Sequence, residues 1–163
     1  MGIRARLRRE DGAAAVEFAL IAGVLAMLIF GMLQFGVAFF QLQNLRASAR
    51  EGGRIGAVGA TVTQVKQKVA DTSLGAIPPN SGAVNVYYTS NGTTWGAPLA
   101  GATTACPPKA NQTLASATKV QINLASSNLP ASLQDIFVLD IPFLPPISLR
   151  GASIEADFRC EGN

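Results

Sequence analysis

The chain of 163 residues contains no histidine, two cysteines and few charged side chains. Without histidine, Ser-His-Asp and Cys-His catalysis are excluded, together with metal sites that use imidazole ligands. The two cysteines, Cys106 and Cys160, are too few for a zinc site of their own. The sequence therefore predicts neither a metal site nor a cofactor.

Basic residues are scarce beyond the first twelve positions. The formal net charge is +3, but Arg4, Arg6, Arg8 and Arg9 all lie in this short leader, and the later basic residues form no stripe with interleaved aromatics. Nucleic acid is therefore not expected as a partner. Apolar residues make up 48% of the chain and charged residues 14%. This balance favours a membrane-attached or assembly protein over a free cytosolic enzyme.

The apolar residues gather in one long run. From Ala13 to Phe40 the only strongly polar side chains are those of Glu17 and Gln34. As a helix, Phe18 to Phe40 would reach about 34 Å, which exceeds the roughly 30 Å of a hydrocarbon layer. This segment is predicted to span a membrane once.

The orientation of the span depends on two features. Arginines both precede the span and follow it at Arg46, Arg50 and Arg54, so the positive-inside rule favours a cytoplasmic N-terminus only slightly. Both cysteines lie beyond the span, and a disulfide there indicates a compartment outside the cytoplasm, although two unrelated free thiols remain an alternative. We expect a head that is periplasmic or extracellular.

The helix is expected to continue past the membrane to about residue 60. A small apolar face recurs at three- and four-residue spacing, the arginines lie on a separate face, and Glu51 can pair with Arg54. The face comprises Leu42, Leu45, Ala49, Gly52 and Gly56. The glycines indicate either close packing of another helix or a frayed helix end, and the sequence leaves both open.

Residues 61–163 are predicted to form a small α/β head. A capping box at Thr61 begins a second helix that should stop near Gly75. After this helix, apolar and polar residues alternate, which predicts strands at Val84–Thr89, Thr118–Ala125 and around Ile154–Cys160. The fold class is therefore α+β, a long N-terminal transmembrane helix followed by an antiparallel sheet.

Two details of the head follow from turns and side-chain phase. Asn91-Gly92 is a tight-turn signal that predicts a hairpin returning toward Trp95. The inward phase of Cys160 would place its sulfur near the sheet core, within reach of Cys106. The apolar segment Pro130–Pro146 cannot form a long helix because of its prolines, and it is expected to fold onto the sheet or, alternatively, to remain an exposed surface.

Glu17 needs an explanation, because a carboxylate in hydrocarbon costs roughly 2.5 to 3.5 kcal/mol on insertion scales. A secretory signal cut after Ala47-Ser48-Ala49 would lie too far beyond the run. In a plain anchor Glu17 would reach to the cytoplasmic interface. Alternatively, cleavage between Gly12 and Ala13 would create an α-ammonium about one helical turn before the carboxylate.

The basic leader, Gly12, Glu17 and Phe18 before an apolar helix resemble the class III processing site of the TadE-like pseudopilins, minor components of the tight-adherence (Tad, or Flp) pilus. Further matches are "FGMLQFGVAFFQ" at residues 30–41 and "ASAREGGR" at residues 47–54. Gly53 stands where alanine is commoner. The closing segment "ISLRGASIEADFRCE" at residues 147–161 is similar to the last strand of this family, but this match is less specific.

The resemblance implies that a membrane prepilin peptidase removes residues 1–12 and leaves Ala13 as the mature N-terminus. It further implies a non-enzymatic role in pilus assembly, surface adherence and biofilm formation, with TadF, TadG, the Flp pilin and the inner-membrane platform as partners. TadG-like chains usually carry a much longer head, whereas a TadF-like identity stays open.

Two other classes of protein compete with this interpretation. An uncleaved, single-pass periplasmic binding protein would need a pocket within residues 80–160. An enzyme would need a catalytic pair, for which Glu155 and Asp157 share one face of a strand. At surface strand positions such carboxylates are more often solvated, so an enzyme is not expected.

Overall fold

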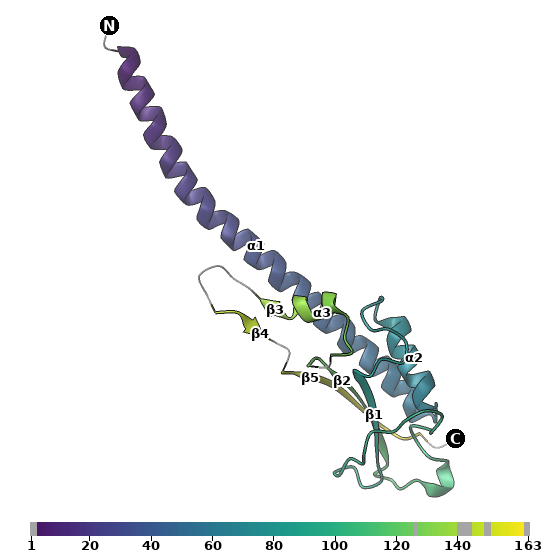
Figure 1. Ribbon diagram of the computed structural model, residues 1–163. Coiled ribbons are helices and arrows are strands. Elements are labelled where there is room, and N and C mark those ends of the chain that lie inside the picture. Colours follow the sequence, from purple (N-terminus) through teal and green to yellow (C-terminus); the bar gives the residue numbers. More distant parts are fainter. Residues whose placement is uncertain (1–2, 126, 140–144, 149–150, 162–163) are drawn as a thin grey trace.

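A long helix enters a small head at the end opposite the N-terminus (Figure 1). The computed structural model describes residues 3–125, 127–139, 145–148 and 151–161, with side chains described within these ranges from residue 12 onward except at Ser132 and Leu139. The elements are α1 Ile3–Ala57, α2 Val62–Thr72, β1 Val84–Thr89, the 3-10 helix η1 Lys109–Asn111, β2 Ala117–Asn123, α3 Ala131–Ile136, β3 Val138–Leu139, β4 Ile147–Ser148 and β5 Ser153–Arg159. The predicted α+β class is confirmed.

The first half of α1 projects away from the head with its apolar side chains uncovered. Leu20, Phe30 and Met32 are 66–74% exposed, far more than side chains of their size in the core of a soluble protein. Among the described residues, one helical stretch, Gly12–Ala57, is long and apolar enough to cross a membrane. This finding agrees with a single-pass anchor.

Helix α2 begins where the capping box predicts. The Thr61 hydroxyl accepts a hydrogen bond from the backbone N–H of Gln64, and the Gln64 side chain accepts one from the backbone N–H of Thr61 at 2.9 Å. Val62, Val65 and Val69 are fully buried on one face. The helix ends at Thr72, slightly before the predicted stop.

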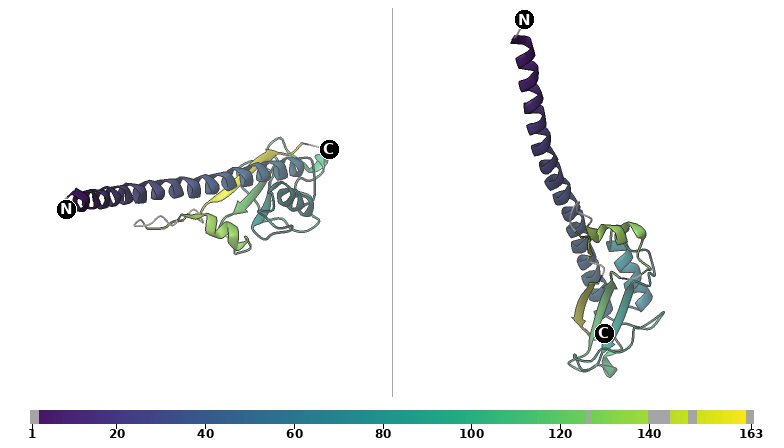
Figure 2. Two further views of the ribbon diagram at one scale, coloured as in Figure 1. Left: turned by 90° about the horizontal axis from the view of Figure 1, so that it is seen from above. Right: turned by 60° about the vertical axis from the view of Figure 1, so that its left-hand side comes forward.

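The sheet has three antiparallel strands in the order β1-β2-β5. Val86 pairs with Val120, and Val120 pairs with Ala156, so the inward positions of the three strands lie in register. Helices α1 and α2 pack against each other and cover this face (Figure 2). The core lies between the helices and the sheet, and the predicted strand phases are confirmed.

The hairpin predicted after β1 is present only in part, because the turn and the return form but no second strand does. Gly92 has a φ of +73°, and the Asn91 side chain accepts hydrogen bonds from two following backbone N–H groups. The returning segment lies antiparallel to β1 and donates two backbone hydrogen bonds to it, from Gly96 N–H to the Tyr88 carbonyl at 3.0 Å and from Leu99 N–H to the Val86 carbonyl at 2.8 Å, but it forms only an isolated bridge with β1 and no strand. Pro98 lacks the N–H that a continuing ladder requires, and the strand that pairs with β1 is β2.

Close packing, and not fraying, explains the glycines near the end of α1. The helix is continuous through Ala57. A Cβ at Gly52 would lie 2.5 Å from a methyl group of Val69 in α2, and a Cβ at Gly53 would overlap the Phe158 ring of β5. These two positions allow the backbone of α1 to approach both neighbours within van der Waals contact.

Most of the described part of Pro130–Pro146 folds onto the head, as predicted. Leu133 and Phe137, in and just after α3, are 3% and 0% exposed and join the core. Residues 140–144 of this segment lie outside the described residues, and Pro145 and Pro146 are exposed.

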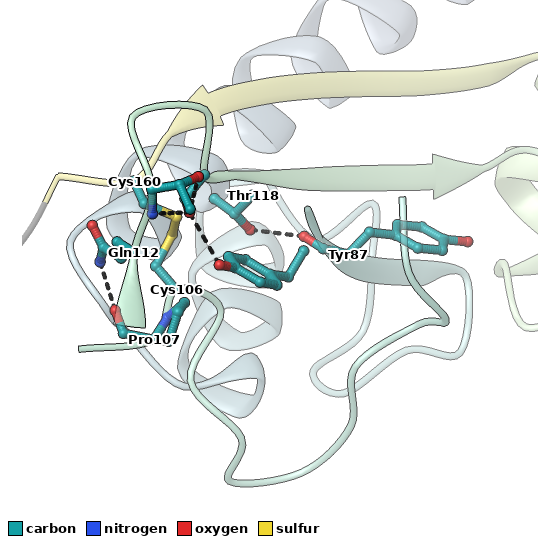
Figure 3. Close-up of a disulfide and its surroundings, with 9 residues drawn as sticks. Tyr87, Cys106, Pro107, Gln112, Thr118 and Cys160 are labelled. Atoms are coloured by element: carbon teal, nitrogen blue, oxygen red, sulfur yellow. Dashed lines mark hydrogen bonds between the residues drawn. A yellow bond between two sulfur atoms is a disulfide. The ribbon is translucent and has the colours of Figure 1, made fainter. Parts of the chain in front are cut away.

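The predicted disulfide joins Cys106 to Cys160 and closes a loop with a sequence separation of 54 (Figure 3). The two Cα atoms are 5.8 Å apart, a usual separation for a disulfide. The Cys160 N–H donates to the Ser116 carbonyl at 2.9 Å, which continues the pairing of β5 with β2 beyond the last strand residue. The bridge therefore ties the loop before β2 to the end of the sheet.

Gly52→Val is expected to lower the free energy of unfolding of the head by about 1–3 kcal/mol, because its methyl groups would overpack the junction with α2. Urea unfolding of the full chain in detergent, followed by the fluorescence of its only tryptophan, Trp95, measures this change. Ala47→Val, at an exposed position of the same helix, is the control and should shift the midpoint little. Equal shifts in the two variants would contradict the packing explanation.

Replacing both cysteines, as Cys106→Ser with Cys160→Ser, is expected to reduce the stability of the head by about 4 kcal/mol in the chain-entropy model for a loop of this length. The same unfolding experiment, with and without a reducing agent, measures the loss. The reductant should destabilise the parent chain and leave the double variant unchanged. A parent chain that is indifferent to reductant would contradict the expected contribution.

Candidate functional site

The first candidate site lies on the free, N-terminal part of α1. Gly12, Ala13, Glu17 and Phe18 occupy one continuous stretch of helix, and all four are exposed. Apart from its chain neighbours and the adjacent backbone of its own helix, no described atom lies within 4 Å of the position that a Cβ at Gly12 would take. A protein that recognises this stretch therefore meets no obstruction from the head.

The peptide bond between Gly12 and Ala13 lies within the helix. A peptidase needs local access to the backbone around the bond that it cuts, so the helix must open there. Glycine is about 0.8–1.0 kcal/mol less favourable than alanine in a helix interior, which lowers the cost of opening at this point. The small residue also leaves the carbonyl carbon of Gly12 sterically accessible.

Glu17 carries the only acidic side chain in the apolar run. Among the side chains that the structure describes, it forms no ion pair. Ala13 precedes it by four residues, which is about 6 Å of helical rise, and residues spaced by four share a helix face. An amine created at Ala13 would therefore lie on the same face as the carboxylate, in this chain or a neighbouring one.

A second charged group links α1 to α2. The Arg54 guanidinium donates to Glu51 at 3.1 Å, as the sequence predicts, and Lys68 Nζ lies 3.6 Å from the same carboxylate. The hydrogen bond from Arg54 is the main reason that the pKa of Glu51 lies below its usual value. The Lys68 contact was not predictable, because the sequence does not specify how α2 lies against α1.

The outer face of the sheet carries the carboxylates considered for catalysis. Glu155 accepts a hydrogen bond from Gln121 at 2.6 Å and pairs with Lys119 at 3.5 Å. Burial raises the pKa of Asp157, the positive charge of Lys119 opposes that rise, and the charge of Glu155 adds to it. The two carboxylates thus lie around one lysine, whose side chain is only 12% exposed, while Glu155 is 40% exposed; this is the arrangement of a structural cross-strand ion pair.

Lys119 also contacts two aromatic rings, and no sequence motif predicts these contacts. Its Nζ lies 5.2 Å from the ring centroid of Tyr87 and 4.8 Å from that of Trp95. Tyr87 is directly opposite Lys119 in the register of β1 and β2, a signal that correct strand pairing would have provided. Trp95 comes from the irregular loop after β1 and has no such signal.

Two open grooves border α1. One of about 420 Å³ lies between α1 and the segment α3–β3, and one of about 340 Å³ lies between α1 and β5 beside Arg46 and Arg50. Both have α1 as one wall, so neither is formed by residues 80–160 alone, as the binding-protein alternative requires. A smaller groove of about 190 Å³ beside Cys106 is lined mainly by that part of the chain, with Val58, Gly59 and Glu161 completing it.

The comparisons with known proteins agree with the sequence pattern in one segment. No curated protein and no solved structure matches the chain significantly. The family described as TadE-like protein matches residues 12–54, which includes Gly12, Glu17 and the glycines that pack α1 against the head. The predicted TadE-like resemblance is thus confirmed over residues 12–54.

Proposed function

We propose that this chain is a minor pseudopilin of the Tad/Flp pilus, a type IVc pilus, and that it takes part in pilus assembly, surface adherence and biofilm formation. The observation that carries the proposal is the TadE-like match over residues 12–54. It coincides with the exposed apolar helix and with Glu17 near its start, which forms no ion pair with any side chain that the structure describes. The TadE-like family is a pilus-associated, structural kind of protein, which favours a role without enzymatic activity.

In this proposal, prepilin peptidase hydrolyses the bond after Gly12. Water adds to the Gly12 carbonyl carbon, the C–N bond breaks, and the new α-amine of Ala13 takes up a proton. The cut releases a cytoplasmic leader of residues 1–12. The mature chain then consists of an anchor and extended helix, residues 13–60, and a head, residues 61–163. The peptidase belongs to the cell, and this chain is its substrate.

The disulfide supports placing the head outside the cytoplasm, because such bonds persist in oxidising compartments. The chain would then reside in the bacterial inner membrane with its N-terminus cytoplasmic, and it could enter the fibre. TadF, TadG, the Flp pilin and the inner-membrane platform are the proposed partners.

Glu17 is proposed to set the axial register of helix packing. An ion pair in hydrocarbon is costly when one partner is missing, so the contact between Glu17 and an Ala13 amine would penalise every other register. Apolar contacts along the helix are less selective, because many registers bury similar surfaces. The amine could belong to the same subunit or to its neighbour.

Gly12→Glu is expected to block processing, because the charged side chain obstructs the bond and its recognition. Intact-mass analysis of protein from the native host should show a precursor that retains residues 1–12. Gly2→Glu places the same side chain elsewhere in the leader and is the control, expected to be cut. Normal processing of Gly12→Glu would contradict the cleavage site, and a parent chain that keeps its leader would favour the uncleaved binding protein.

Glu17→Val is expected to leave membrane insertion intact and to impair piliation strongly in a complementation assay. The substitution removes the charge that selects the register and makes the span more apolar. Glu17→Asp keeps a carboxylate on the same helix face and should restore part of the piliation. Full piliation by Glu17→Val would count against the register role.

A further inference from the structure

One part of the head points back along α1 toward its apolar half. Figure 1 shows α3 next to α1, with β3 and β4 successively further from the helix, all on the side of the head nearer to the N-terminus. The sheet β1-β2-β5 and α2 lie further toward the end of α1. The segment α3–β4 is therefore the part of the head closest to the predicted span.

The groove between α1 and this segment shows which residues of α1 the segment lies beside. Its walls are apolar except at Gln34 and Asp135. The lining residues are Leu33, Gln34 and Val37 from α1, and Asp135, Ile136 and Val138 from α3 and β3. The segment therefore lies alongside Gln34.

Gln34 lies close to the membrane boundary on the head side. It is the first strongly polar side chain after Glu17, seventeen positions further along the helix. That separation corresponds to about 26 Å of rise, close to the roughly 30 Å of a hydrocarbon layer. With Glu17 near one interface, a layer of about 30 Å would end about twenty residues further along the helix, between Gln34 and Phe40. Ile136 and Val138, which line the groove together with Gln34, would therefore lie at the head-side end of the predicted span.

At this level the head exposes apolar side chains. Ile147 in β4 is 52% exposed although it pairs with β3, and Pro145 and Pro146 before it are exposed. Phe137 next to β3 is fully buried and fixes the segment to the core. The exposed residues are thus linked to the core through β3, which follows Phe137 and pairs with β4, and they lie on the side of the head nearer to the N-terminus of α1.

We propose that this surface, formed by Ile136, Val138 and Pro145–Ile147 and here called the membrane-facing ribbon, rests in the lipid boundary on the head side of the membrane. Acyl chains at that boundary would fill the apolar groove beside Leu33 and Val37, where water is unfavourable. Ile136 and Val138 line one groove together with Leu33 and Val37 of the exposed apolar helix, so lipid is the expected occupant. The inference depends on the membrane-anchor part of the proposed function, but not on cleavage or pilus assembly.

The test uses tryptophan quenching by lipids that carry bromine on their acyl chains. The full chain with Trp95→Phe receives one new tryptophan, as Ile147→Trp, Phe30→Trp or Leu114→Trp, and is reconstituted into phosphatidylcholine vesicles. Phe30 lies near the middle of the span, and Leu114, 90% exposed, is the matched control on the head.

The tryptophan at position 147 should lose a large part of its fluorescence, most strongly with bromines near the carboxyl end of the acyl chains. The tryptophan at position 30 should be quenched most by bromines deeper in the chains, and that at position 114 should not be quenched. Quenching at position 30 but not at position 147 would overturn the ribbon inference alone. If the tryptophan at 147 is unquenched and its emission is blue-shifted, a second copy of the chain covers the ribbon in place of lipid, which also overturns the inference. Quenching at neither position would overturn the anchor as well.

Discussion

The close approach of α1 to the head at Gly52 and Gly53 is the contact on which the other features depend. These two positions place the backbone of one helix against the side chains of α2 and β5 at once. Around this junction the core of the head closes, and the Glu51–Lys68 ion pair adds a polar link between the same two helices. A side chain there would separate the sheet from the helix that anchors it.

The junction makes the membrane segment and the head mechanically continuous. α1 has no break between Gly12 and Ala57, and Glu17 precedes Gly52 by thirty-five positions, about 52 Å of helix. The register that we propose Glu17 selects would therefore be transmitted to the head as an axial position. A flexible linker at the membrane surface would lose this relationship, because the head could then move independently of the span.

The sequence predicted those parts of the fold whose signals are local. The alternation in β2 and β5, the capping box at Thr61 and the apolar run of α1 each depend on residues close in the chain, and all three are confirmed. The partner of β1 was missed, because strand pairing is non-local and Asn91-Gly92 suggested a nearer one. The position of α3–β4 beside α1 was unpredictable for the same reason, since it depends on how Phe137 fills the core.

The proposed partner of Glu17 could not be found in the structure of one uncut chain. That partner is an amine that exists only after cleavage, so the uncut chain contains half of the pair. The membrane-facing ribbon differs, because its proposed cover, the lipid, is present from insertion onward. If the subunit leaves the bilayer to enter a fibre, the apolar span and the ribbon lose their lipid in the same step. Neighbouring subunits must then cover both surfaces together, which couples the docking of the head to the register at Glu17.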